Sequence, residues 1–190
     1  MASKSRLSEW RIELAIKEGV EDVLGRNMLV SFSRDLGIKL KNVRLIKLFR
    51  IIAKIPEARI RDIAFEILAD PVVNDVSINK PLSMKDEIVI EREFLPGVTD
   101  NEAKTAREQI ELFLEKKLGE GESIHTGIQY LLKGCTPEEA GKISKWVANP
   151  LMHGIKIREG GLKVISDMGK CVSSFKPKVE IINLWDSLRG

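Results

Sequence analysis

Gly-Val-Glu-Asp at residues 19–22 recurs as Gly-Val-Thr-Asp at residues 97–100, 78 residues further along the chain. A second pair of segments has nearly the same separation, because Ala-Asp-Pro-Val at residues 69–72 recurs as Ala-Asn-Pro-Leu at residues 148–151, 79 residues later. Either match alone is a weak signal. Two matches in the same order and at near-equal offsets indicate an internal duplication, and a duplicated chain is expected to build the same folding unit twice.

Each copy has the pattern of a β-α-β-α-β unit. Strands are expected where apolar and polar residues alternate, at 11–16, 42–55 and 73–78 in the first copy and at 88–94, 124–132 and 152–157 in the second. The Gly-Val-x-Asp turn follows the first strand of each copy, where glycine can adopt a positive φ and aspartate can cap the next helix. The second helix of each copy is expected to end before Asp70-Pro71 or Asn149-Pro150, because proline disfavours helical geometry in the preceding residue.

Apolar stripes predict the core-facing side of the four helices. In the first helices the stripe is Leu24, Met28, Phe32 and Leu36, matched by Ala103, Ala106, Ile110, Phe113 and Leu114. In the second helices it is Ile60, Ile63, Ala64 and Ile67, matched by Ile143, Trp146 and Val147. Pro56-Glu57 is expected to begin one of these second helices, and Thr-Pro-Glu-Glu at residues 136–139 is a strong start signal for the other.

The expected fold class is α/β of the α+β kind, a tandem repeat of ferredoxin-like-related units with pseudo-two-fold symmetry. Each unit would place two helices on one face of a small sheet and would be marginally stable alone. The small sheets are therefore expected to pack face to face or to join edge to edge, which buries apolar surface at about 25 cal/mol per Å². The expected divisions are an N-terminal extension at 1–9, units at 10–80 and 86–157, a link at 81–85, and a tail or start of a linker at 158–190.

The tail is expected to differ from the two units. Gly160-Gly161 predicts a flexible break. Residues 179–185 are apolar and are expected to pack as a final strand or an extended arm.

Composition excludes several classes of protein. The net charge is +3, with 31 basic and 28 acidic residues, a mild excess that argues neither for nor against nucleic-acid binding, because strong binders usually concentrate basic charge on one face. The two cysteines, Cys135 and Cys171, form neither a disulfide framework nor a CxxC metal site. No stretch is long and apolar enough to span a membrane, and the first residues lack the apolar core of a signal peptide, so the expected location is the cytoplasm.

Few residues could carry chemistry. His125 and His153 could serve as general bases, but structural or solvated histidines are the favoured interpretation. Cys135 precedes a helix, which can lower a thiol pKa, yet no His/Asp arrangement accompanies it. Gly-Glu-Gly-Glu at residues 119–122 lacks the ending of a phosphate loop and is predicted to be a plain loop. No catalytic, cofactor-binding or metal-binding residue is predicted.

The motifs resemble those of phosphoribosylformylglycinamidine synthase. Residues 17–25 are similar to the first turn of its small subunit, Lys-x-Gly-Val-x-Asp-Pro-x-Gly, with Val23 in place of the proline. Residues 68–72 resemble the Leu-x-Asn-Pro-Val segment of the same subunit. Residues 94–101, with residues 105–108, look closer still to the N-terminal region of the long, fused form of the enzyme. The resemblance covers about Trp10 to Ile157.

The resemblance implies a non-catalytic module that assembles the enzyme of purine biosynthesis, bridges its ATP-using synthetase and its glutaminase, and helps ammonia pass between them. ATP and magnesium are then expected in the partner synthetase of this C–N ligase, and none of the catalytic residues can be carried over. A further homodimer is also considered. Whether the chain is a stand-alone subunit or the front of a longer enzyme stays open, with the second slightly favoured. The motif residues are expected to form structural turns and an interface: Gly19, Val20, Asp22, Pro71, Pro96, Gly97, Val98, Asp100 and Pro150.

Two other functions are compatible with paired β-α-β units. The first is a regulatory module that binds a small molecule between the units. The second is RNA binding, which is weakly supported because aromatic residues make up only 5% of the chain and do not cluster on a strand around Tyr130.

Overall fold

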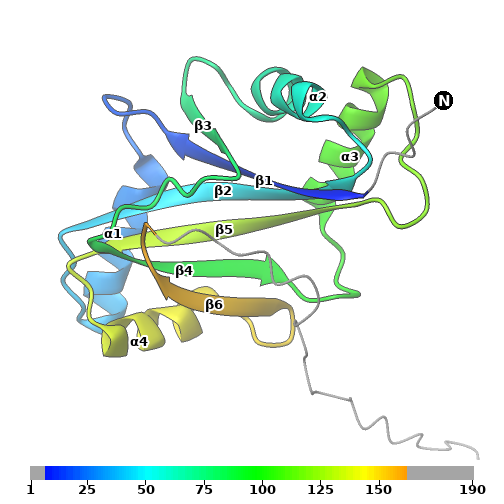
Figure 1. The fold of residues 1–190 in the computed structure, drawn as a ribbon. Coiled ribbons are helices and arrows are strands. Elements are labelled where there is room, and N and C mark those ends of the chain that lie inside the picture. Colours follow the sequence, from blue (N-terminus) through cyan, green and yellow to red (C-terminus); the bar gives the residue numbers. More distant parts are fainter. Residues whose placement is uncertain (1–6, 162–190) are drawn as a thin grey trace, which may run out of the picture.

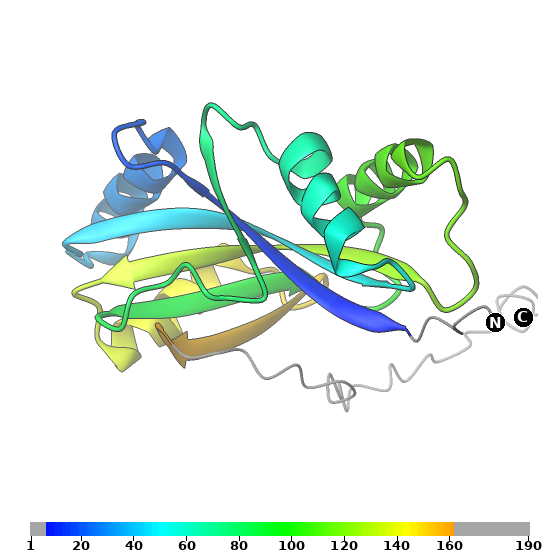
Figure 2. The ribbon, with the colours of Figure 1, turned by 45° about the horizontal axis from the view of Figure 1, so that its top comes forward.

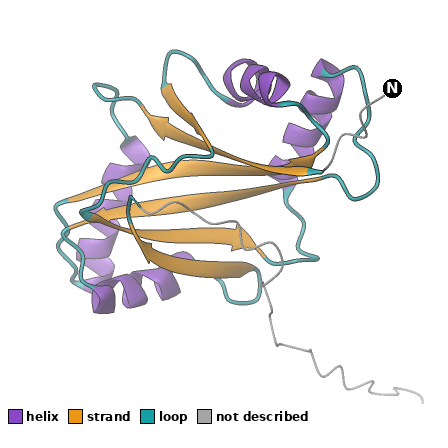
Figure 3. Ribbon diagram, in the orientation of Figure 1, coloured by secondary structure: helices purple, strands orange, loops and turns teal. Residues whose placement is uncertain are grey.

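The structure is a computed structural model that describes residues 7–161, and the fold is given for that part of the chain. It is an α+β fold with an open, antiparallel, six-stranded sheet of order β3-β1-β2-β5-β4-β6 (Figures 1 and 3). The first half of the chain contains β1 (Ser8–Ile16), α1 (Val23–Leu36), β2 (Asn42–Ala53), α2 (Glu57–Asp62), a π-helix (Ile63–Leu68) and β3 (Asn74–Ile78). The second half contains β4 (Glu87–Phe94), α3 (Asn101–Phe113), β5 (Ser123–Lys133), α4 (Pro137–Val147) and β6 (His153–Glu159).

The two halves are joined edge to edge by β2 and β5. These central strands pair antiparallel from Asn42 opposite Lys133 to Ile52 opposite Ser123. Of the two arrangements that the sequence allowed, the structure therefore has one continuous sheet and not a stack of two. The choice could not be made from local patterns, because strand alternation specifies which face is buried but not which edge is paired.

All the helices cover one face of the sheet (Figure 2). The apolar core lies beneath them in two clusters. One cluster packs the helix-facing residues of β1 and β2 against α2, the π-helix and α3. The other packs Phe32 of α1 with Ile143 of α4 over β5 and β4. Each cluster contains residues from both halves, so α1 of the first half and α3 of the second half cross the join and interlock the halves.

Most of the predicted core stripes are confirmed, but the prediction of burial is wrong for two residues. Phe32, Ile110 and Ile143 are fully buried. Leu24, in contrast, is 61% exposed, because it lies at the solvent side of the first turn of α1. Trp146 is 41% exposed, because its ring packs edge-on against Phe32, with 5.5 Å between the ring centroids, at the rim of the core.

The predicted helix signals are confirmed at their starts. Pro56 precedes α2 at its N-cap position. Before α4, the Thr136 side chain accepts from the backbone N–H of Glu139 and the Glu139 side chain accepts from the N–H of Thr136, which is a complete capping box. The single second helix expected for the first half is instead α2 followed directly by the π-helix.

The sheet face without helices carries a small apolar cluster of Ala15, Ile46, Val89 and Leu131. The segment between β3 and β4 crosses this face, and its Leu82 packs on the cluster. The apolar side chains expected here are present, but the same face also buries a network of charged residues that the sequence interpretation did not predict.

The flexible break expected at Gly160 is wrong. The N–H of Gly160 donates to the carbonyl oxygen of Glu87 over 2.8 Å, and a Cβ at this position would lie 1.9 Å from the carbonyl oxygen of Met84. Only glycine fits such a close backbone approach, so residue 160 is a packed turn at the end of β6. Strand β6 itself continues to Glu159, into the segment that was assigned to the tail. The arm expected at residues 179–185 lies outside the described residues.

Candidate functional site

The motif residues of the first half form a turn between β1 and α1 that contacts the segment before β3. Gly19 has φ +89, in the left-handed region that favours glycine. Lys17 ties the two segments together, since its N–H donates to the carbonyl oxygen of Val73 and its ammonium group donates to that of Pro71. Val20 is exposed beside this turn.

The second half repeats these contacts at the opposite end of the antiparallel sheet. Gly97 has φ +88, and the exposed Pro96 precedes it. The N–H of Leu95 donates to the carbonyl oxygen of Met152, which follows Pro150. The predicted motif residues are therefore brought together within each half, whereas the two turns lie at opposite ends of the molecule.

The two motif aspartates have the same structural role. Asp22 caps α1 by accepting from the N–H of Gly25, and its other carboxylate oxygen accepts from the N–H of Leu45 in β2. Asp100 caps α3 by accepting from the N–H of Ala103, and its carboxylate also accepts from the N–H and the hydroxyl of Thr126 in β5. Each aspartate thus fixes the start of a helix to the next strand, as the predicted capping role requires.

We expect Asp22→Ala and Asp100→Ala each to lower the free energy of unfolding by about 1–3 kcal/mol, because each loses a helix cap and leaves a strand N–H without its acceptor. The exposed Asp75→Ala is the control, with an expected change within about 0.5 kcal/mol. Urea unfolding measures all three. A cost confined to one of the two aspartates would contradict their equivalence.

An open cleft of about 560 Å³ lies beside the first motif turn. Its charged lining includes Lys17, Arg26 and Arg44 together with Asp22 and Asp75. The arginines already have partners, since Arg26 pairs with Glu21 and Arg44 makes a bidentate contact with Glu87. The cleft can therefore accept a small polar molecule, but its two arginine side chains are already paired and are not available to bind an anion.

The candidate residues for catalysis are not assembled into one site. His125 is exposed on the helix-free face and contacts the Ser123 hydroxyl over 3.0 Å. His153 begins β6, where its ring lies 5.1 Å from that of Phe94 and Nδ1 accepts from the N–H of Asn149. Cys135 lies in the loop before α4, and burial raises the pKa of its thiol to about 11, so the thiol is neutral at pH 7. None of the hydrogen bonds within residues 7–161 joins two of these three side chains.

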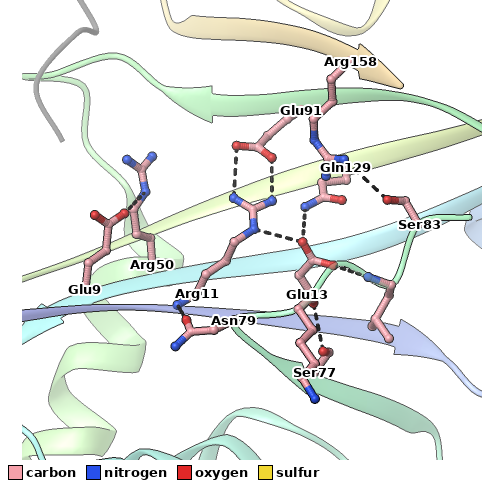
Figure 4. Close-up of polar contacts among 12 residues, drawn as sticks. Glu9, Arg11, Glu13, Arg50, Ser77, Asn79, Ser83, Glu91, Gln129 and Arg158 are labelled. Atoms are coloured by element: carbon pink, nitrogen blue, oxygen red, sulfur yellow. Dashed lines mark hydrogen bonds and ion pairs between the residues drawn. The ribbon is translucent and has the colours of Figure 1, made fainter. Parts of the chain in front are cut away.

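The strongest polar constellation is a network of buried charges on the helix-free face, which we call the central network (Figure 4). It is built by Arg11 and Glu13 of β1, Glu91 of β4, Gln129 of β5 and Arg158 of β6. These strands place alternate side chains on this face, so residues distant in sequence meet across the sheet. Glu13 and Gln129 are fully buried, and Glu91 is 3% exposed.

Arg11 holds the network together. Its guanidinium contacts Glu13 over 2.9 Å and both carboxylate oxygens of Glu91, the shorter contact being 2.6 Å. Burial by itself would raise the pKa of Glu91, but the hydrogen bonds and charge of Arg11 outweigh it and hold that pKa below the ordinary value. The same two glutamates raise the pKa of Arg11 despite its burial. The Glu91 carboxylate is therefore ionised at pH 7 and paired with Arg11.

The other members of the central network are only partly satisfied. Gln129 donates its amide N–H to Glu13 over 2.8 Å, which fixes the orientation of the amide, and its Oε1 has no hydrogen-bond partner. Arg158 contacts the Ser83 hydroxyl through Nη1 over 3.4 Å, while its Nε and Nη2 are buried without a partner. Ser83 and Leu82 belong to the segment between the halves, and the N–H of Leu82 donates to Glu13 over 2.7 Å. The network thus couples β1, β4, β5, β6 and the connecting segment.

Another buried carboxylate, Glu111, organises the loop after α3. It accepts from Lys117 over 2.8 Å, from the N–H of Leu118 over 3.0 Å and from Arg107 over 2.9 Å. The Lys117 contact, followed by the Leu118 N–H, lowers the pKa of Glu111 to about 2.

Because the pKa of Glu111 is depressed in the folded chain, its stabilisation is present above the ordinary value of 4.5 and is lost as the pH falls towards about 2. We expect the free energy of unfolding to fall over this range, and Glu111→Gln to reduce the slope. Glu108→Gln, at an exposed position of the same helix, is the control. Denaturant titrations at a series of pH values measure the slopes, and equal slopes for Glu111→Gln and the wild type would refute the assignment.

The central network is a buried structural element that holds the strands of the sheet together. Its carboxylates are paired with arginine, and no nucleophile lies among its members. Within residues 7–161, no group of three or more His, Cys, Asp or Glu side chains is placed to hold a metal ion. The sequence contained a signal for this network in the alternating charges at Glu9, Arg11 and Glu13, but the partners on β4 and β5 depend on the strand order.

Comparison of the chain with protein-family models, with curated proteins and with solved structures gave no match. In the described part of the chain, no helix has the length and apolar character needed to cross a bilayer.

Proposed function

We propose that the chain is a duplicated, non-catalytic assembly module whose halves are two copies of one ferredoxin-like-related β-α-β-α-β unit. The observation that carries this proposal is the strand register. Each residue of β1 corresponds to the residue of β4 that lies 78 positions later, and its partner in β2 corresponds to the residue of β5 that lies 81 positions later. The pair of Glu13 and Leu48, for example, corresponds to the pair of Glu91 and Gln129. Ile12 opposite Ile78 likewise corresponds to Ile90 opposite Ile157.

The join between the halves obeys the same rule. The β2–β5 ladder maps onto itself about the pair Lys47 and Ile128, as expected for a pseudo-two-fold axis through the middle of the sheet. The turns add independent support, because Asp70 and its counterpart Asn149 each accept from two backbone N–H groups of the following residues. Chance resemblance between two small units would not reproduce ladder registers and turn hydrogen bonds together.

The function that this architecture supports best is the one implied by the motif resemblance. We assign the chain to the assembly and ammonia-transfer part of phosphoribosylformylglycinamidine synthase, in purine biosynthesis in the cytoplasm. The matching motifs, Gly19 to Asp22 and Gly97 to Asp100, occupy equivalent turns with the same positive φ and the same cap. A covalently joined pair of units presents two related surfaces, which suits a bridge between a synthetase and a glutaminase and leaves room for a further homodimer.

The catalytic steps of that enzyme would belong to its partners. The synthetase would bind ATP and magnesium, and the glutaminase would release ammonia. The residues of this chain would position those partners. The central network would keep the sheet rigid while they bind, since paired buried charges specify a single arrangement of β1, β4 and the connecting segment.

Capture by the tagged chain tests this proposal. The expected result is the joint retention of an ATP-dependent synthetase and a glutaminase from an extract of the native source, supplied with glutamine and ATP. The matched control is the Arg11→Leu chain at a temperature where it is unfolded. Retention of neither enzyme by the folded chain would overturn the proposal.

A regulatory small-molecule module is the second candidate, and the cleft beside Gly19 favours it. The cleft has about 560 Å³ of space and a lining of mixed charge, which fits a zwitterionic metabolite. A thermal-shift screen of amino acids and nucleotides separates the two candidates. A saturable rise in the melting temperature that Arg26→Ala abolishes would favour the regulatory function.

A further inference from the structure

Strand β3 leaves one row of backbone groups at an open edge of the sheet. Its inner side pairs with β1. The N–H of Lys17 donates to the carbonyl oxygen of Val73, and the N–H of Asn79 donates to that of Arg11, and these two bonds fix which residues of β3 direct their backbone groups towards β1. The N–H and C=O groups of Val76 and Ile78 therefore point away from β1. These groups can pair with a further extended strand.

A cleft of about 480 Å³ runs beside this edge, between β3 and the helical segment formed by α2 and the π-helix. Its apolar lining consists of Trp10, Phe65, Val76 and Ile78. Phe65 is 46% exposed, and the indole N–H of Trp10 has no acceptor among the described residues. An edge strand beside an apolar cleft is the arrangement in which a bound strand gains main-chain hydrogen bonds and side-chain pockets together.

The charges at the cleft are mainly positive. Arg61 and Lys80 line it, are exposed, and have no ion-pair partner among residues 7–161. Glu57 is its single acidic lining residue. The cleft therefore favours a segment that carries carboxylates.

The second half has different side chains at the equivalent positions. Counted from the N-caps of the two helices, Pro56 and Thr136, Gly141 stands where the first half has Arg61, and Lys145 stands where it has Phe65. At the position of Trp10 the second half has Ile88. The aromatic lining is thus a property of the first half, which is how a duplicated module can distinguish its two partners.

We propose that β3 and its cleft bind an extended, acidic segment of a partner protein. The segment adds a strand to β3 at Val76 and Ile78, places an apolar side chain between Trp10 and Phe65, and sets a carboxylate against Arg61 or Lys80. The inference rests on the proposed assembly function, for which it names one docking surface.

The first test uses Trp10 as the reporter in the full chain with Trp146→Phe and Trp185→Phe. The probe is the peptide acetyl-Glu-Val-Glu-Val-Glu-Val-amide, compared with its analogue that has lysine at each glutamate. The expected result is a saturable change in Trp10 emission, with a dissociation constant for the lysine analogue that is at least about tenfold higher. The absence of a saturable change, or equal binding of both peptides, would overturn the inference.

The second test blocks the edge. Val76→Pro removes an outward N–H without removing a bond to β1, and we expect it to weaken peptide binding about tenfold, as does Phe65→Ser. Ile155→Pro, at the equivalent outward position of β6, is the matched control and should leave binding unchanged. Equal effects of the two proline variants would refute docking at β3.

The two proposals can fail separately. If the wild-type chain captures synthetase and glutaminase while Val76→Pro and Phe65→Ser capture both equally well, the docking surface is wrong and the assembly function stands. If the wild-type chain captures neither enzyme, the assembly function is wrong whatever the peptides do.

Discussion

Arg11→Leu is expected to lower the free energy of unfolding by about 3–5 kcal/mol. The substitution leaves Glu13 and Glu91 buried and without their shared cation, and an uncompensated buried charge costs more than the ion pair itself contributes. A domain of this size is stabilised by roughly 5–15 kcal/mol in total, so the loss is a large fraction of its stability. Guanidinium unfolding followed by circular dichroism measures it.

Two further variants separate the central network from ordinary surface charge. Arg26→Leu removes an exposed ion pair with Glu21 and should change stability by less than about 1 kcal/mol. Adding Glu91→Gln to Arg11→Leu should recover part of the loss, because it removes one of the unpaired charges. If Arg11→Leu costs no more than Arg26→Leu, the central network does not organise the sheet.

Phe32→Ala is expected to lower the free energy of unfolding by about 3–5 kcal/mol. We expect this loss to destabilise both halves of the chain by the same amount. Phe32 is fully buried in α1 of the first half, yet its cluster consists largely of second-half residues, among them Ile143 and Tyr130. Its counterpart Ile110 lies in α3 of the second half and packs in the cluster under α2. Ile110→Ala should therefore cost about 2–5 kcal/mol with the same cooperativity.

Hydrogen exchange resolved by peptide measures that cooperativity. In both variants, peptides from β1 and from β6 should lose protection by the same free energy, because the interlocked helices make the halves one cooperative unit. If Phe32→Ala lowers protection only within residues 8–78 and leaves residues 87–159 unchanged, the halves fold independently and the interlocking is not energetically important.

Local features of the fold could be predicted from the sequence because local residues determine them. The positive φ of Gly19 and Gly97, the aspartate caps and the capping box before α4 depend on a few neighbouring residues. Strand positions followed from alternation and were correct to within a few residues. The exposure of Leu24 could not be read in this way, because a stripe of spacing four drifts around the helix and its first member lies beyond the core.

The non-local features required the strand order. Glu13 and Glu91 look like solvent-facing residues of two separate strands, and only the order β1-β2-β5-β4 sets Glu91 within reach of Arg11. Gly160 looked like a flexible residue because its close contact with Met84 comes from a segment 76 residues away. The cleft beside β3 also escaped prediction, since Trp10 and Phe65 meet through the packing of an edge strand against a helix.

We propose that this chain couples a synthetase to a glutaminase and that the chemistry takes place on those partners. The most direct measurement compares amidine synthesis from formylglycinamide ribonucleotide and ATP, with glutamine or with ammonium as the nitrogen source, in the presence and absence of the chain. We expect the glutamine-dependent rate of the purified synthetase and glutaminase to depend on the chain, and the ammonium-dependent rate of the synthetase to depend on it far less. A glutamine-dependent rate that is the same with and without the chain would contradict it.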